Sequence, residues 1–214
     1  MTTLAEELVL LAFDDQTGRN RVNYLDYGLV GAVLLDLTLA QRIDLSGRHV
    51  VVHDSRPTGE PVHDEILQRI QQSRPRKPAV WVQKLRKGLR NRVLDKLVAA
   101  SVLRHQKDTV MGLFPMNRYF VVIDTLKTDA RNRLSHAVDT GAKPNEPTAA
   151  LAGLVNALKM ERHALPGRKT RDTRKALAAI AEKSWASEAI KKAIAATQSA
   201  VTASTGAAAL GGGS

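Results

Sequence analysis

Residues 27–40 constrain the fold most strongly, because almost every position in this segment is apolar. Val33, Leu34, Leu37 and their neighbours leave almost no polar face, so the spacing predicts a helix buried on nearly all sides. Such a helix must lie at the centre of a core and be covered by other elements. Gly28 near its start allows another segment or a ligand to approach closely.

The segments around this helix have the periodicity of amphipathic elements. A T-x-x-E capping box at Thr3 and Glu6 marks the start of the first helix. Helices are predicted at residues 4–13, 61–72, 85–98, 128–138, 147–159 and 170–196, and β-hairpins at 42–53 and 109–123. The sequence therefore predicts a mainly α-helical single domain with two short β-hairpins over residues 1–196, followed by a low-complexity flexible tail at 197–214.

The net charge of +11 is unevenly distributed along the chain. Residues 1–70 carry six Arg and 11 acids, a net charge of −5, whereas residues 71–107 carry 11 basic residues and one acid, a net charge of +10. An excess of this kind indicates an anionic partner, such as nucleic acid, a membrane surface or an acidic protein. Leu89, Val93 and Leu97 recur at helical spacing within the basic segment, so its cations belong to a folded helix.

Three cations of this basic helix stand out when residues 85–98 are projected on a helical wheel. Arg86, Lys87 and Arg90 fall at the edge of the apolar sector, whereas Arg92 lies opposite. If Gly88 marks a break, these three cations surround a helix start, where the macrodipole disfavours positive charge. Either a bound phosphate relieves this cost, or the side chains bridge to acids of residues 1–70.

The second hairpin, residues 109–123, is rich in large apolar side chains. We expect Phe114 and Met116 at its tip, with Tyr119 alongside and Leu113 next to them. These residues could contact the core, a second copy of the chain, a nucleic acid as the wing of a winged helix, or a lipid headgroup layer. The mixture of apolar and basic residues favours the membrane interface over a DNA backbone.

Catalytic and metal-binding patterns are weak. The chain has no Cys, so thiolate metal sites are excluded, and the sequence holds no H-E-x-x-H, G-x-S-x-G, Walker or dinucleotide fingerprint. His49, His53 and His63 lack paired ligand spacing, so we expect them to be structural or solvated. No cofactor and no enzymatic activity are predicted. The absence of Cys, of a basic n-region and of long apolar runs favours a cytoplasmic protein.

Four motifs then occur in an order that resembles the Golgi phosphoprotein 3 family. They are LAEELVLLAFDDQTG at 4–18, GLVGAVLLDLTLAQRI at 28–43, PTGEPVHDEIL at 57–67 and LRNRVLDKLVAASVL at 89–103. This resemblance implies a non-enzymatic adaptor that binds phosphatidylinositol 4-phosphate. The Ala-rich and Arg-rich composition without Cys looks like a bacterial-type member.

The resemblance also implies which residues hold the headgroup. The family's pair of basic residues at the start of the basic helix falls on Lys87 and Arg90, with Arg92 as the next match. Its second-helix Arg falls on Val30. Its Trp has no direct counterpart; Arg21 occupies the ungapped position and Tyr24 offers an aromatic ring after a small shift.

Together these observations predict a peripheral membrane protein that binds an anionic phospholipid headgroup through Lys87, Arg90, Arg92, Arg21 and Tyr24. Leu113, Phe114, Met116 and Tyr119 are expected to form the membrane-contacting hairpin, which could also join copies of the chain into an oligomer. A protein cargo is a further expected partner. The alternative is a winged-helix-like nucleic-acid-binding protein, in which residues 86–100 read a groove and 109–123 form the wing.

Overall fold

The computed structural model describes residues 2–110, 114–183, 196 and 199–207. Helices and two small antiparallel sheets make up this part of the chain, which confirms the predicted mainly α-helical domain with two short hairpins. The helices are α1 (Leu4–Ala12), α2 (Leu25–Leu39), α3 (Pro61–Gln71), α4 (Pro78–Leu85), α5 (Leu89–Ala99), α6 (Thr125–Thr140), α7 (Glu146–Ala157), α8 (Glu161–Ala164) and α9 (Thr170–Lys183). The strands are β1 (Ile43–Ser46), β2 (His49–Val52), β3 (Leu103–Val110) and β4 (Phe114–Val121).

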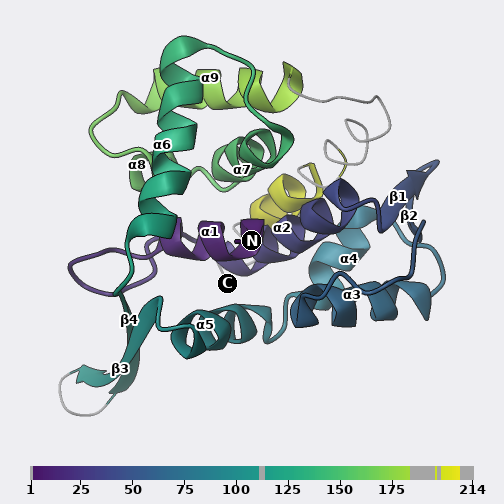
Figure 1. The fold of residues 1–214 in the computed structure, drawn as a ribbon, viewed down its shortest axis with the longest axis horizontal. Coiled ribbons are helices and arrows are strands. Elements are labelled where there is room, and N and C mark those ends of the chain that lie inside the picture. The colour runs from purple at the N-terminus through teal and green to yellow at the C-terminus, as the bar shows by residue number, and fades with distance from the viewer. Residues whose placement is uncertain (1, 111–113, 184–195, 197–198, 208–214) are drawn as a thin grey trace.

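Helix α2 occupies the centre, as its apolar composition predicts. Figure 1 shows α1 and α2 crossing the middle of the molecule, with α6, α7 and α9 on one side and α3 and α5 on the other. Helix α2 contacts α1 and α7 as well as α3, α4 and α5, and Val30 within it is fully buried. Gly28 permits the predicted close approach, because a Cβ there would lie 2.4 Å from Cδ1 of Leu158.

Helix α1 begins with the predicted capping box. The Thr3 Oγ1 accepts a hydrogen bond from the Glu6 amide at 3.2 Å, and the Glu6 carboxylate accepts one from the Thr3 amide at 2.8 Å. The helix is buried on every side, including Glu6 and Glu7, because α2, α5, α6 and α7 all pack against it. The amphipathic pattern of residues 4–13 predicts burial of one face only, so it underestimates the burial of α1.

The basic segment folds as two helices separated at Gly88, where the sequence suggested a break. Helix α4 ends at Leu85, and Gly88 adopts a left-handed φ of 77° before α5 begins. Helix α5 then ends at Ala99, and Ser101 takes a left-handed φ of 57° in the turn that leads into β3.

The second hairpin begins earlier than predicted. Strand β3 starts at Leu103, and Thr109 pairs with Pro115 while Asp108 pairs with Met116, so residues 114–116 lie in strand β4 and not at the tip. Residues 104–107 are all exposed, because the hairpin projects from the core, so they lack the alternation of apolar and polar residues that would predict a strand. Residues 111–113, including Leu113, lie outside the described part of the chain.

The carboxyl-terminal helices cover α1 and α2 from one side. Helix α9 is described as far as Lys183, so the rest of the helix predicted at 170–196 lies largely outside the described residues. Residues 199–207 are helical, and Val201 is fully buried, whereas low-complexity composition suggested only a flexible tail. None of the described helices is both long enough and apolar enough to cross a membrane.

Candidate functional site

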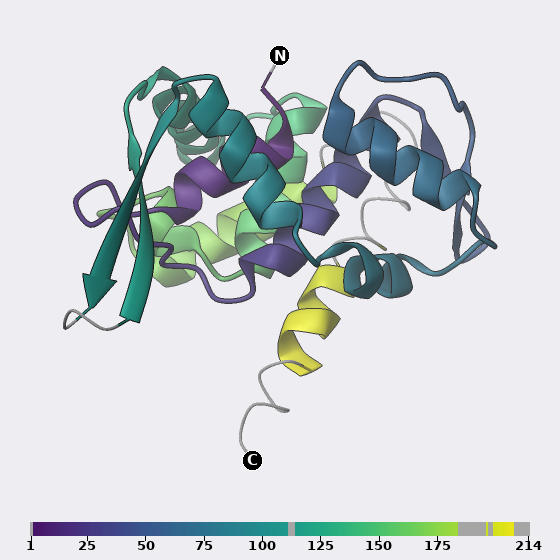
Figure 2. The same cartoon turned by 90° about the horizontal axis from the view of Figure 1, so that it is seen from below.

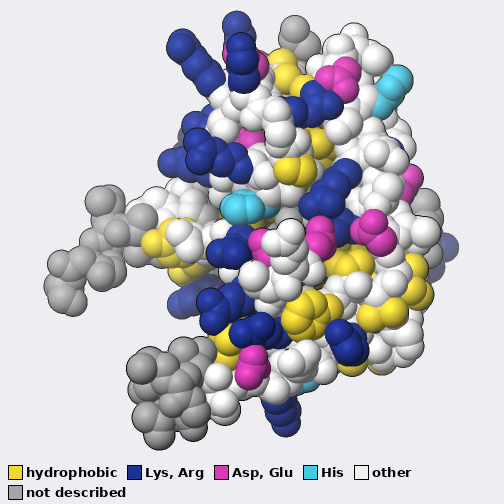
Figure 3. All heavy atoms as spheres, turned by 90° about the vertical axis from the view of Figure 1, so that its left-hand side faces the viewer, with side chains coloured by type: hydrophobic (Ala, Val, Ile, Leu, Met, Phe, Trp, Pro, Cys, Tyr) yellow, Lys and Arg dark blue, Asp and Glu magenta, His cyan; other side chains and the backbone are white. Residues whose placement is uncertain are grey.

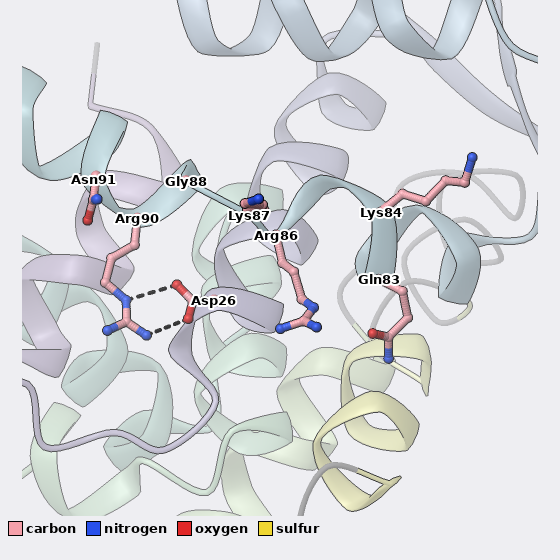
Figure 4. Close-up of a pocket in the computed structure, with 8 residues that line it drawn as sticks. All are labelled: Asp26, Gln83, Lys84, Arg86, Lys87, Gly88, Arg90 and Asn91. Atoms are coloured by element: carbon pink, nitrogen blue, oxygen red, sulfur yellow. Dashed lines mark hydrogen bonds and ion pairs between the residues drawn. The ribbon is translucent and has the colours of Figure 1, made fainter.

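A pocket of about 610 Å³ opens at the junction of α4 and α5. Basic and polar side chains dominate its wall. Its lining residues are Asp26, Gln83, Lys84, Arg86, Lys87, Gly88, Arg90 and Asn91. Lys87 and Arg90, predicted from the wheel and from the family resemblance, therefore come together in one pocket. Figure 4 shows Arg86 and Arg90 extending to the same side of the junction, with the Asp26 carboxylate between them.

The first turn of α5 gives this pocket a positive potential beyond its side chains. Gly88 is the N-cap and no side chain caps the helix. The first turn also carries no acidic residue. Backbone N–H groups at a helix start lack intrahelical acceptors, and the macrodipole adds partial positive charge there. Cations placed around such a start are stabilised when an anion binds between them.

Arg90 is held by an acid from another helix. Its Nε and Nη2 donate to the two carboxylate oxygens of Asp26 at 2.9 and 2.6 Å. Asp26 lies in the first turn of α2, where a negative charge also offsets the dipole of that helix. This fork-to-fork pair fixes the guanidinium plane and partly neutralises it. Within the part that the structure describes, Lys84 and Lys87 have no ion-pair partner.

Arg86 extends from the same junction over an aromatic ring. Its guanidinium carbon lies 5.3 Å from the centroid of the Tyr27 ring, which is a cation–π arrangement. The Tyr27 ring is in turn 6.1 Å from the ring of Tyr24. Tyr24 itself lines a second pocket of about 460 Å³, together with Arg21 and Met160.

Three predicted headgroup ligands, Arg21, Tyr24 and Arg92, therefore lie away from the α4–α5 pocket. Arg21 belongs to the second pocket, and its Nε is 3.4 Å from the Asp14 carboxylate. Arg92 forms an ion pair with Glu65 of α3 and does not line either pocket. The alternative interpretation for Arg86, Lys87 and Arg90, bridging to acids of residues 1–70, holds for Arg90, which pairs with Asp26; Arg92 is engaged in the same way by Glu65.

The hairpin residues are placed by packing against the loop that follows α1. The Tyr119 ring meets Phe13 edge-on at 5.6 Å and stacks on His105 at 4.7 Å. The Tyr119 amide donates to the Gly18 carbonyl at 2.8 Å. Met116 accepts a hydrogen bond at its sulfur from Nη2 of Arg19 at 2.8 Å. The predicted membrane contact of Leu113 and of the Phe114 side chain falls outside the described residues.

Sequence reasoning missed four side chains of the α4–α5 pocket, which are Asp26, Gln83, Lys84 and Asn91. Lys84 and Gln83 lie within α4, where no motif marked them. Asp26 lies just before the helix predicted at residues 27–40, and no motif marks it, although a carboxylate there can reach a cation of the basic segment. The signal that could have found Gln83 and Lys84 is the break at Gly88, because it turns the last residues of one helix toward the first turn of the next.

A sequence model of one known family covers most of the chain. The family is described as Golgi phosphoprotein 3 (GPP34), and the match extends over residues 4–197. It spans α1 through α9, including the α4–α5 junction. The chain therefore belongs to the Golgi phosphoprotein 3 family.

Proposed function

We propose that this protein binds the headgroup of an anionic phospholipid, phosphatidylinositol 4-phosphate or a related phosphoinositide, and so associates peripherally with a membrane surface. The observation that carries the proposal is the uncapped start of α5 within a pocket lined by Lys84, Arg86, Lys87 and Arg90. The family is known for non-enzymatic adaptors that bind phosphoinositides, which supports the same function.

The charges of the pocket suit a phosphomonoester. Four cations and one carboxylate line it, so its formal charge is +3. A phosphate group accepts hydrogen bonds from helix-start amides and from Lys or Arg side chains. Asp26 orients Arg90 and at the same time competes with the phosphate for it. The pocket therefore favours a ligand with more than one negative charge, which can replace this internal partner.

The surroundings of the pocket suit a membrane interface. Figure 2 shows strands β3 and β4 and helix 199–207 extending toward the same side of the molecule, where α4 also lies. Figure 3, which faces the left-hand side of Figure 1, shows Lys and Arg side chains with apolar side chains among them toward that side. Each basic residue near an anionic surface contributes about 1 kcal/mol of attraction.

The cations farther along α5 do not favour nucleic acid as the partner. Arg92 pairs with Glu65, and Lys96 pairs with Glu6 and Glu60. A recognition helix needs free side chains along its length to contact bases and phosphates. Here Glu6, Glu60 and Glu65 occupy those side chains, and in the described part of the chain the unpaired cations Lys84 and Lys87 lie beside the first turn.

Liposome flotation tests the proposal. The wild-type chain is compared on phosphatidylcholine vesicles that contain phosphatidylinositol 4-phosphate and on vesicles with phosphatidylserine at equal total charge. We expect binding that weakens with added salt and is strongest with the phosphoinositide. Lys87→Ala combined with Arg90→Ala should abolish most of this binding. The matched control, Arg171→Ala with Lys175→Ala, removes the same charge from the exposed side of α9 and should bind like the wild type.

Unchanged flotation of the Lys87/Arg90 double variant would refute the site. A DNA mobility-shift assay on the same preparation addresses the alternative function. Tight DNA binding with a steep salt dependence, together with no preference for anionic vesicles, would refute lipid recognition.

A further inference from the structure

A separate pocket of about 720 Å³ lies near the amino end of α1, where Thr2 and Thr3 form part of its wall. In Figure 2 the amino end of the chain is at the upper edge, opposite helix 199–207 and the free end of the hairpin. The titratable and charged residues that line the pocket come from α1, α2, α6 and the start of α3. They are Glu7, Asp36, Glu60, His63, Asp129 and Arg133.

Glu7 brings a buried carboxylate to this pocket. Only 8% of the residue is exposed, and its Oε1 accepts a hydrogen bond from Nη2 of Arg133 at 2.5 Å. Its Oε2 is buried and has no hydrogen-bond partner among the described residues. Burial raises the pKa of Glu7 to about 7, against the opposing effect of Arg133. Glu7 lines the pocket, and the carboxylate oxygen that lacks a donor lies beneath the pocket surface.

His63 brings a second polar atom without a partner. The residue is 4% exposed, and its Nε2 lies 2.9 Å from Oδ2 of Asp36. In the neutral ring, Nε2–H donates to this carboxylate, so Nδ1 carries a lone pair and acts as an acceptor. The buried Nδ1 has no partner among the described residues. The same Asp36 carboxylate also accepts the Leu4 amide at 3.1 Å.

The nearby donors are already used. Arg133 donates to Asp129 at 2.8 Å and to Thr148 at 2.7 Å in addition to Glu7. Lys96 is engaged by Glu60 and by Glu6 of α1. Four carboxylates but only one Arg line the pocket, so it is acidic in a chain whose net charge is +11. A buried acceptor without a donor costs free energy, which a ligand carrying N–H groups would recover.

We propose that this pocket binds a small organic cation, a primary ammonium group on a short apolar stem. The ammonium would donate to Glu7 Oε2 and His63 Nδ1, and the stem would lie against Leu4, Leu39 and Pro147 in the same wall. Both acceptors are shielded from solvent, so binding requires these side chains to shift. The terminal torsion of Glu7 is broad and easily changed, whereas the His63 ring can shift only as far as its Nε2 keeps the hydrogen bond to Asp36. Among the described residues, no group of three or more His, Asp or Glu is arranged to hold a metal ion, which favours an organic cation.

Isothermal titration calorimetry with n-butylammonium, n-hexylammonium and putrescine tests this proposal on the full chain. We expect at least one of these amines to bind, and its neutral isostere, n-butanol for the first, to bind about tenfold more weakly or not at all. Glu7→Gln keeps the size of the side chain and should weaken amine binding about tenfold or more. Asp139→Asn is the matched control, since Asp139 is an α6 acid outside the pocket wall, and it should leave binding unchanged.

Asp129→Asn provides a second variant that does not disturb the core, because 65% of the Asp129 side chain is exposed. It should weaken amine binding severalfold even if Glu7→Gln fails to fold. Absence of binding by all three amines, equal binding of butylammonium and butanol, or equal affinities of the Asp129→Asn and Asp139→Asn variants would overturn the proposal. Lipid binding at the α4–α5 junction plays no part in this test, so either proposal can fail without the other.

Discussion

The pH dependence of stability gives a quantitative test of the buried carboxylate of Glu7. Burial raises its pKa from 4.5 to about 7 in the folded chain. Below pH 4.5 both the folded and the unfolded states hold this proton. Between pH 4.5 and 7 the unfolded chain loses the proton whereas the folded chain keeps it, so stability falls as the pH rises through this window.

The magnitude follows from the size of the pKa shift. Each pKa unit corresponds to about 1.4 kcal/mol, so Glu7 should remove roughly 3 kcal/mol of stability between pH 4.5 and 8. Glu7→Gln cannot titrate and should abolish this contribution. Arg133 keeps Asp129 and Thr148 as hydrogen-bond partners in the variant, so its guanidinium is not left unpaired.

Urea unfolding followed by circular dichroism at several pH values from 4.5 to 8 measures the effect. The wild-type free energy of unfolding should fall by roughly 3 kcal/mol more than that of Glu7→Gln over this range. Asp36, whose pKa burial also raises, contributes in the same direction to both proteins, and its charge also acts on Glu7, so the difference between the two curves includes this coupling. Parallel stability curves for the two proteins would refute the burial of an ionisable Glu7 and the reasoning built on it.

Two further substitutions probe the α4–α5 site and the core. Asp26→Asn removes the carboxylate charge that engages Arg90. In flotation titrations we expect about fivefold tighter binding to phosphoinositide vesicles, which is equivalent to about 1 kcal/mol. Weaker binding would show that Asp26 positions Arg90 more than it competes with the phosphate for it. Gly28→Ala places a methyl group 2.4 Å from Leu158, so urea unfolding should show a loss of about 1–3 kcal/mol, and an unchanged midpoint would contradict the close packing of α2 on this residue.

The sequence predicts the helical framework well because its signals are local. The apolar run of residues 27–40 requires a central helix, and Thr3 with Glu6 sets the start of α1 through contacts three residues apart. Gly88 likewise marks the helix break beside Lys87, because the turn between α4 and α5 has a left-handed backbone conformation, which glycine adopts readily. These features depend on neighbours in the chain, so the sequence alone can reveal them.

Features that depend on contacts between distant segments were predicted less well. The Asp26–Arg90 pair joins residues 64 positions apart, and no pattern within either helix indicates it. The predicted hairpin starts at residue 109, whereas β3 starts at Leu103, because polar residues such as Arg104 and Lys107 make the first half of β3 resemble a loop. The polar run is compatible with a strand only because the hairpin stands away from the core and is held at its base by Gly18 and Tyr119.

The distribution of ion pairs explains how a strongly basic segment produces a local site. Asp26 of α2 pairs with Arg90, and Glu65 of α3 pairs with Arg92. Lys96 pairs with Glu6 of α1 and with Glu60, which immediately precedes α3, so much of the charge on α5 is neutralised within the fold. Among the residues that the structure describes, Lys84 and Lys87 have no such partners next to the uncapped helix start. The acidic first third of the chain therefore does more than balance the net charge. By pairing with the later turns of α5, it leaves the unpaired cations of the α4–α5 segment at one junction, where a single phosphate group can meet them and the helix start together.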